Sequence, residues 1–167
     1  MRLRPSGMNE EKAEPRDRAS GRPAVRRMDN VAIVVDDLAA AVAFFLELGL
    51  ELEGEATVEG SAVDRIVGLE GVRSDIAMVR MPDGHGRIEL TKYRSPSSPG
   101  GDRRAPVNAL GAHRIMFAVD DMDDVLDRLR PHGAELLGEV VRFEDSYRLC
   151  YLRGPAGILV ALAEEIS

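Results

Sequence analysis

The feature that most constrains this chain is an internal repeat. Residues 30–55, NVAIVVDDLAAAVAFFLELGLELEGE, align without a gap with residues 114–139, RIMFAVDDMDDVLDRLRPHGAELLGE. The two segments are identical at eight positions, including the triplet V-D-D and a later glycine, Gly49 in the first copy and Gly133 in the second. Self-similarity at a fixed spacing is typical of a structural unit that is used more than once. The sequence therefore predicts one motif, present twice.

Each copy has the pattern of a strand, a helix and a second strand. The run VAIVV, residues 31–35, is rich in β-branched residues and suits a buried strand. Asp37 follows at the position of an N-cap, where its carboxylate can accept from the free N–H groups of the first turn. Apolar residues then recur at helical spacing, and Gly49 can end the helix in a left-handed conformation. The second copy repeats this pattern, with Asp121 as its cap.

The rest of the chain extends each copy to a βαβββ module. Alternating segments predict further strands, and a short helix precedes them in the first module; these elements are expected at residues 61–69 (helix), 74–81, 87–93, 146–153 and 158–163. We place the first module at residues 28–93, a Pro- and Gly-rich linker at 94–110 and the second module at 111–165. Residues 28–165 are thus expected to form one α+β domain.

Residues 1–27 differ in composition from the predicted domain. They are polar, carry eight Lys or Arg against four acids, and show no apolar periodicity. We predict a flexible tail; an arm that binds an acidic partner, or a natural start at Met28, are the alternatives. The segment also lacks the apolar core of a signal peptide, so we expect a cytoplasmic protein.

Composition excludes several classes of protein. The 167-residue chain of 18.2 kDa is 44% apolar, which allows a packed interior, but no apolar run is long enough to cross a membrane. Its lone cysteine, Cys150, excludes an internal disulfide framework and a thiolate metal cluster. A net charge of −7 argues against a nucleic-acid partner, which would require a basic face.

Two tandem βαβββ modules, each opening with a V-D-D-L-like turn from strand to helix, resemble the vicinal oxygen chelate (VOC) superfamily. It includes glyoxalase I, extradiol dioxygenases, methylmalonyl-CoA epimerase and bleomycin-resistance proteins. The resemblance covers residues 28–165 and is specific for fold rather than chemistry. It implies a glyoxalase-like fold, in which the sheets of both modules form an open eight-stranded barrel around a cleft. It also implies a homodimer, in agreement with the strand edges and apolar surface that two open half-sheets leave uncovered.

Strand alternation predicts which residues line that cleft. The bulkier alternate residues of each first strand should lie under the helix, which leaves Asn30 in the first module and Arg114 and Met116 in the second on the cleft side. In the fourth strand of the first module, Arg87 and Glu89 take the cleft side by the same argument. We expect these residues to contact a ligand.

The resemblance also identifies the positions at which metal-dependent relatives carry a His or Glu. They lie on the first and last strands of each module and correspond here to Asn30, Glu89, Arg114 and Ala161. Only Glu89 matches, because Asn offers a weak carbonyl oxygen, Ala offers nothing and Arg is a permanent cation. We therefore expect no bound metal. The alternative is Fe, Mn, Ni or Zn, held with help from His113, if a strand irregularity near Gly111 turns it inward, or from His85 in the D-G-H-G turn.

Glu89 is the strongest candidate for a catalytic residue. It could abstract a proton from a carbon acid or anchor a cationic or hydroxylic ligand. The structural alternative is an ion pair between Glu89 and Arg114 or Arg87. Tyr147 and Arg148, in the strand YRLCYLR, are expected to border the cleft and to orient a ligand.

Three hypotheses remain for function. The first is a metal-free protein of the bleomycin-resistance kind that binds a small organic molecule. The second is an enzyme of the glyoxalase (lyase), epimerase or dioxygenase type that uses Glu89 as metal ligand or general base. The third is a degenerate member that serves only in assembly. Since a fold does not determine a function, the sequence leaves enzyme status open.

Overall fold

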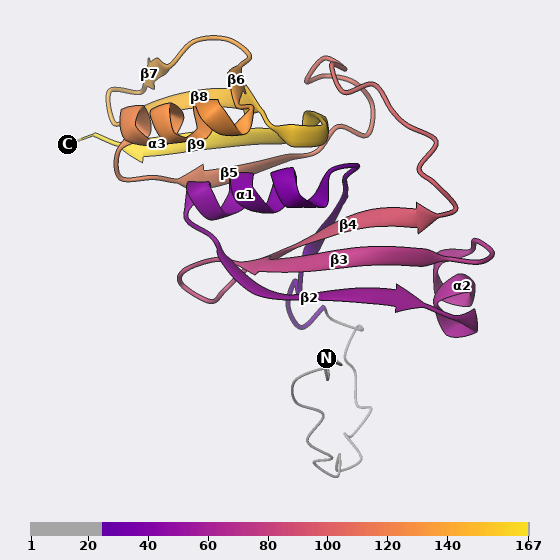
Figure 1. Cartoon of the computed structure of the whole chain (residues 1–167). Coiled ribbons are helices and arrows are strands. Elements are labelled where there is room, and N and C mark those ends of the chain that lie inside the picture. The colour runs from indigo at the N-terminus through magenta and orange to yellow at the C-terminus, as the bar shows by residue number, and fades with distance from the viewer. Residues whose placement is uncertain (1–24, 167) are drawn as a thin grey trace, which may run out of the picture.

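The computed structural model describes residues 25–166, in which the βαβββ pattern occurs twice (Figure 1). The tail predicted at residues 1–27 lies almost wholly outside these residues. The first module contains β1 (Val31–Val34), α1 (Leu38–Leu48), β2 (Glu51–Glu59), α2 (Ser61–Val67), β3 (Arg73–Arg80) and β4 (Arg87–Ser95). Its strands lie in the order β1-β4-β3-β2, with β1 parallel to β4 and the other pairs antiparallel.

The second module has the same plan with one broken strand. Its elements are β5 (Arg114–Ala118), α3 (Met122–Leu129), the short 3-10 helix η1 (Arg130–His132), β6 (Glu135–Leu136), β7 (Val141–Phe143), β8 (Tyr147–Arg153), the 3-10 turn η2 (Pro155–Gly157) and β9 (Leu159–Glu165). Strands β5, β9, β8 and β6 lie side by side in that order, and β7 also pairs with β8. Where the first module has the continuous β2, the second therefore has two short strands, β6 and β7, which pair with opposite ends of β8.

The expected helix ends are confirmed in both modules. The carboxylate of Asp37 accepts from the N–H of Ala40 at 3.0 Å, and that of Asp121 accepts from the N–H of Asp124 at the same distance. Gly49 ends α1 with a φ of 116°, a left-handed value that glycine adopts without strain. In the second module α3 continues into η1, and Gly133 then ends η1 with a left-handed φ of 87°.

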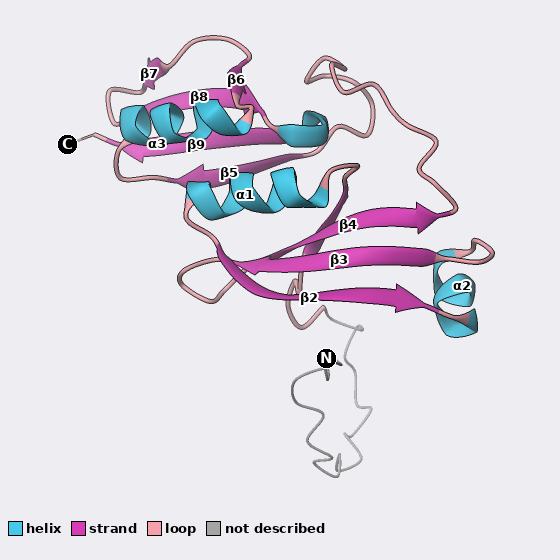
Figure 2. Ribbon diagram, in the orientation of Figure 1, coloured by secondary structure: helices cyan, strands magenta, loops and turns pink. Residues whose placement is uncertain are grey.

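The two sheets share one hydrophobic core within residues 25–166. Phe44 and Phe45 of α1 are fully buried between Leu90 of the first sheet and apolar residues of the second module, including Phe117 and Leu162. In Figures 1 and 2, α1 and α3 both lie on the viewer's side of the strands, so the uncovered faces of both sheets are turned to the back. We call these uncovered faces the open faces.

Strand pairing confirms the equivalence of the two modules and shows that the sheets are not closed. Ala32 pairs with Glu89 between β1 and β4, and Met116 pairs with Ala161 between β5 and β9. Strands β1 and β5 are both edge strands, and no backbone ladder joins them in the described part of the chain. The α+β, glyoxalase-like architecture is thus confirmed, as two open sheets rather than a continuous barrel wall. None of the helices within residues 25–166 is long and apolar enough to cross a membrane.

Candidate functional site

Glu89 lies on the open face of the first sheet, as strand alternation predicts. Its neighbours Ile88 and Leu90 are buried in the core, whereas Glu89 is half-buried on the opposite side of β4. The side-chain amide of Asn30 donates to Oε2 of Glu89 at 3.1 Å, and the hydroxyl of Thr91 donates to Oε1 at 2.9 Å. Two neutral donors therefore orient this carboxylate, and it forms no ion pair within residues 25–166.

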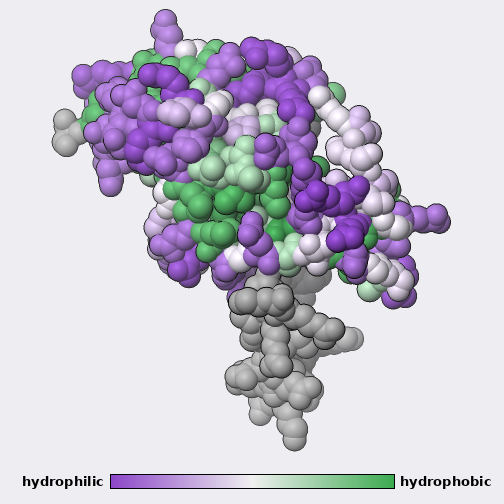
Figure 3. All heavy atoms as spheres, viewed as in Figure 1, coloured by the Kyte–Doolittle hydropathy of each residue, from purple (hydrophilic) through white to green (hydrophobic). Residues whose placement is uncertain are grey.

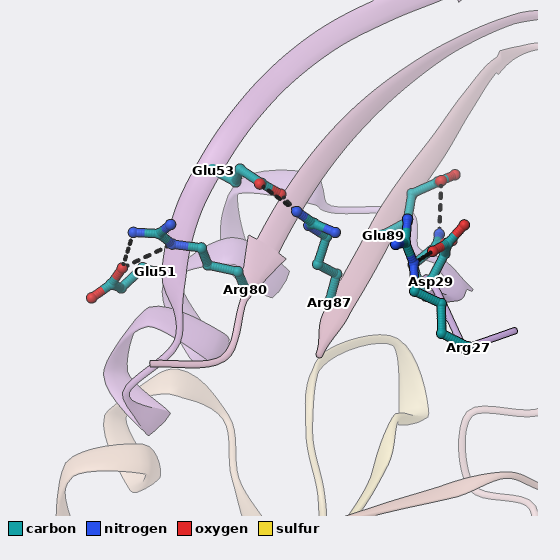
Figure 4. A network of polar contacts seen from close by, with 8 residues as sticks. Arg27, Asp29, Glu51, Glu53, Arg80, Arg87 and Glu89 are labelled. Atoms are coloured by element: carbon teal, nitrogen blue, oxygen red, sulfur yellow. Dashed lines mark hydrogen bonds and ion pairs between the residues drawn. The ribbon is translucent and has the colours of Figure 1, made fainter. Parts of the chain in front are cut away.

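A row of ion pairs runs beside Glu89 across the same sheet (Figure 4). Arg87 bonds Glu53 at 2.7 Å, and this hydrogen bond, helped by the positive charge, holds the pKa of the Glu53 carboxyl below its usual range. Arg80 bonds Glu51 at 2.7 Å. The expected alternative, an ion pair between Glu89 and Arg87, is not formed within the described residues, because Arg87 turns toward β2.

Arg114 occupies the corresponding open face of the second module. Its guanidinium carbon lies 4.1 Å from the centre of the Tyr151 ring, close enough for a cation–π interaction. Within residues 25–166 no carboxylate lies within ion-pair distance of Arg114, Glu89 included. Met116 and Tyr147 lie on the same open face and are 52% and 41% exposed. This face therefore offers an uncompensated cation beside aromatic and apolar surface.

The structure corrects the placement of Arg148. It alternates with Tyr147 and Tyr151 along β8 and shares the face of the buried Cys150, on the side covered by α3. Its guanidinium bonds Asp123 of α3 at 2.8 Å and Glu164 at 2.9 Å. Arg148 therefore holds a helix to its sheet and does not border the open face.

A pocket of about 410 Å³ lies at the seam between the modules. Its lining is mostly apolar and comes from all four residues of β1, the linker, and the residues around β5 and η2; it comprises Val31–Val34, Asp102, Ala105, Pro106, Ala112, His113, Ile115, Arg153, Gly157, Ile158 and Leu159. We call it the seam pocket. A volume of this size suits a small organic molecule.

Glu89 and Arg114, which form no ion pair among the described residues, flank the seam pocket. Glu89 pairs in register with Ala32, which lines it, and Arg114 stands in the chain between the lining residues His113 and Ile115. The wall formed by β1 also carries backbone groups that join no strand ladder within residues 25–166. The N–H of Val35 donates to Thr91 of β4, and since backbone groups alternate along a strand, Ala32 and Val34 direct theirs to the unpaired edge.

Arg153 holds the linker over this pocket. Its guanidinium donates to the backbone carbonyls of Arg103 at 2.9 Å and Ala105 at 2.7 Å. Gly157 packs against the same segment so closely that an added Cβ would lie 2.7 Å from the carbonyl oxygen of Arg103. The linker is therefore held by specific contacts and forms one wall of the seam pocket.

The three histidines and Cys150 form no hydrogen bond with Glu89 within the described residues. His113 is exposed and lines the seam pocket just before β5. His85 is exposed in the turn between β3 and β4, where its backbone N–H donates to Asp83. His132 lies in η1, 3.7 Å from the carboxylate of Glu47. Cys150 is buried, and burial raises the pKa of its thiol, as suits an unreactive core residue.

The side chains at the family's metal positions do not fit a metal ion. Asn30, Glu89, Arg114 and Ala161 supply one carboxylate, one amide that already donates to that carboxylate, one cation and one methyl group. Among the described residues, no group of three or more His, Cys, Asp or Glu side chains is placed to hold a metal. A catalytic metal site usually needs three protein ligands.

Strand alternation also places Thr91 on the face of Glu89, as the structure has it, but two residues of the candidate site, Tyr151 and Arg153, were missed in the sequence. Tyr151 has the strand parity of Tyr147, so alternation contains its signal. The role of Arg153 depends on how the linker folds back, which no local pattern reveals.

Comparisons with known proteins place this fold in a family. The model of the Glyoxalase/Bleomycin resistance protein/Dioxygenase superfamily matches residues 27–162. A glyoxalase family protein from Bacillus cereus, of known crystal structure, is 53% identical, with a TM-score of 0.84; the match covers 89% of this chain and 100% of that chain. No curated protein matches the chain significantly.

Two further solved structures share the fold at lower identity. A glyoxalase family protein from Enterococcus faecalis is 20% identical, with a TM-score of 0.58, over 83% of this chain and 98% of that chain. The fosfomycin resistance protein FosX from Listeria monocytogenes is 14% identical, with a TM-score of 0.57, over 86% of this chain and 94% of that chain. With the tandem modules, the family match and the similarity to the Bacillus cereus protein, the chain belongs to the glyoxalase/bleomycin resistance protein/dioxygenase (VOC) superfamily.

Proposed function

We propose that this protein binds a small organic molecule at the seam between its modules, without the metal ion of metal-dependent relatives. The observation that carries the proposal is the state of Glu89, whose carboxylate is oriented by Asn30 and Thr91 rather than grouped with other metal ligands. A carboxylate held in this way, beside a mostly apolar pocket, is suited to accept a hydrogen bond from a ligand. We expect the protein to act in the cytoplasm.

The chemistry around the pocket indicates the ligand class. Glu89 favours a hydroxyl or cationic group, whereas Arg114 favours an anionic group or a second acceptor. Apolar residues between them, such as Ile115 and Leu159, favour a hydrocarbon or aromatic body. The proposed ligand is therefore an anionic or hydroxylated organic molecule of drug-like size.

An enzyme is the second candidate. Glu89 has no cationic partner within the described residues and keeps acceptor capacity on the open face, as a general base requires. In that role it would take a proton from a carbon acid bound in the seam pocket, and the reaction would be of the epimerase or lyase type.

Thermal-shift measurements with a panel of anionic and hydroxylated compounds test the binding proposal. A binder should raise the melting temperature of the wild type, and Glu89→Gln and Arg114→Ala should each reduce the shift by roughly half or more, since each removes a direct contact. Lys92→Ala is the matched control, because Lys92 lies on β4 but on the opposite face from Glu89. Shifts that persist in both site variants and fall in the control would contradict this site.

Turnover distinguishes the two candidates. A compound that binds and is recovered unchanged after prolonged incubation supports a binding protein. Exchange of a carbon-bound proton with solvent deuterium, lost in Glu89→Gln, would establish the enzyme instead.

A further inference from the structure

Strand β1 is an edge strand without the usual protection of an edge. Within the described residues it pairs with β4 alone, and its register with β4 runs without a bulge. Its four residues, VAIV, include no charge and no proline, two of the features by which edge strands usually avoid pairing with another chain. An edge of this kind can accept a further strand.

The seam pocket runs along this edge. All four residues of β1 line it, and none of the described residues of β4 does, so the pocket borders the side of β1 that faces away from β4. The N–H of Val35 donates to the carbonyl of Thr91 in β4 at 2.9 Å. Alternation then directs the N–H and C=O groups of Ala32 and Val34 to the pocket side. These two residues present two donors and two acceptors to a ligand.

The free edge of β5 is less open to the pocket. The N–H of Val119 donates to the carbonyl of Ala163 in β9, so by the same alternation Ala118 directs its backbone groups away from β9. Within residues 25–166, however, the seam pocket meets β5 only at Ile115. A strand in the pocket would therefore pair with β1 and contact β5 through side chains.

The linker limits what can reach the edge of β1. Asp102, Ala105 and Pro106 form one wall of the pocket. Arg153 fixes this wall by donating to the carbonyls of Arg103 and Ala105. Figure 3 shows pale and hydrophilic surface where the linker runs, at the upper right of the view. A wall held in this way keeps the edge of another folded sheet from β1, whereas a short free chain can occupy the pocket of about 410 Å³.

The surroundings of the pocket suit a short peptide with free ends. Glu89, which pairs in register with Ala32, suits an N-terminal ammonium group, and Arg114 suits a C-terminal carboxylate. The apolar lining, which includes Ile115 and Leu159, suits aliphatic side chains. The four residues of β1 span about 13 Å at about 3.3 Å per residue, the length of an extended tetrapeptide.

We propose that the seam pocket binds short apolar peptides with free ends, which add to β1 as an extra strand through hydrogen bonds to Ala32 and Val34. This inference rests on the proposed function, since it uses the same pocket, and it names the ligand class and the mode of binding. The peptide backbone supplies the contacts to β1, and the side chains of the peptide contact the apolar lining.

Calorimetric titration of the purified protein with the free tetrapeptide Ala-Val-Ala-Leu and its N-methylated forms tests this mode of binding. The unmodified peptide should bind. N-methylation removes an amide donor, and only alternate amides of an added strand face β1. Methylation of one amide should therefore weaken binding roughly tenfold, whereas methylation of the adjacent amide should change it little. Equal losses at adjacent amides, or no binding of the unmodified peptide at millimolar concentration, would overturn the proposal.

Proline variants of the two edge strands test the role of β1 directly. Val34→Pro removes an N–H that the β1–β4 ladder does not use, and it should weaken peptide binding roughly tenfold. Ala118→Pro, at the equivalent position of β5, is the matched control and should leave binding unchanged, because Ala118 does not line the pocket. Circular dichroism should show both variants folded; if Val34→Pro does not fold, the methylated peptides decide the question on the wild type. Equal losses in the two folded variants would contradict pairing with β1.

The anionic and hydroxylated compounds, titrated in the same way, separate this inference from the proposed function. If those compounds bind and the peptide does not, the pocket takes small molecules but β1 accepts no strand, and this inference alone fails. If neither the compounds nor the peptide bind, the proposed function fails as well.

Discussion

At position 44 of the first module a phenylalanine is fully buried in the core, whereas the equivalent residue of the second module, Arg128, lies at the surface and bonds Glu47. The helices begin after equivalent aspartates and are followed by equivalent glycines, yet α1 has Glu47 as its one charged residue and α3 is charged on its outer side. The open faces differ in the opposite sense at equivalent positions, with the charged Glu89 in the first module and Ala161 in the second. One backbone motif thus supports two different sets of surfaces.

This difference shows which residues the fold requires and which are free for function. The residues that both copies keep, the V-D-D triplet and the glycine after the helix, begin and end elements. Many of the residues that differ lie on helix exteriors and open faces, where packing within one module does not determine them. Functional proposals therefore rest on the positions at which the copies disagree.

The largest expected effect separates Phe44 from Arg128. Phe44→Ala should lower the free energy of unfolding by about 3–5 kcal/mol, because it opens a cavity in the shared core. Arg128→Ala should cost about 1 kcal/mol or less, as expected of a surface ion pair. Urea denaturation of both variants measures the difference. Equal losses of stability in the two variants would contradict the structure, in which Phe44 is buried and Arg128 lies at the surface.

The two N-caps should instead behave alike. Asp37→Ala and Asp121→Ala each remove a carboxylate that accepts a first-turn N–H, and each should cost about 1 kcal/mol of stability. Chemical denaturation should give values within a few tenths of each other. A cost confined to one module would break the equivalence of the two copies.

Acid should weaken both modules through carboxylates that are paired with arginine. Hydrogen bonds from Arg87 and Arg148 hold the pKa values of Glu53 and Asp123 below their usual range. A group whose pKa is lower in the folded state stabilises the fold above its ordinary pKa, and this contribution is lost as pH falls through the folded value. Stability should therefore decline below about pH 4, where free carboxyl groups begin to protonate.

Removing one arginine at a time should give the smallest effects on stability. Arg87→Met, in the first module, and Arg148→Met, in the second, should each make the acid decline slightly shallower, because one depressed carboxyl returns to its ordinary pKa. Melting temperatures measured across this pH range report the change. An unchanged profile in both variants would show that solvent screens these exposed pairs, while a change in one variant alone would show which of the two carboxyls stabilises the fold.

The sequence predicts most of the fold and part of the candidate site. The repeated triplet and glycines predict the helix ends, and alternation places Asn30, Glu89 and Arg114 on the open faces, because each neighbours bulky apolar residues. Arg148 was placed wrongly because both faces of the strand YRLCYLR mix apolar and polar residues. The interruption between β6 and β7, and the role of Arg153, depend on contacts between distant segments.

We expect the seam pocket and open faces of this VOC protein to bind their ligand without a metal ion. Metal analysis of the purified, dialysed protein tests this expectation most directly. Inductively coupled plasma mass spectrometry should find Fe, Mn, Ni and Zn far below one ion per chain, and EDTA should leave the melting temperature unchanged. The physical reason is that Asn30, Glu89, Arg114 and Ala161 supply one carboxylate beside a cation. About one equivalent of any of these metals, lost together with stability in Glu89→Gln, would contradict the account; His113→Ala and His85→Ala would then show whether either histidine supplies a ligand.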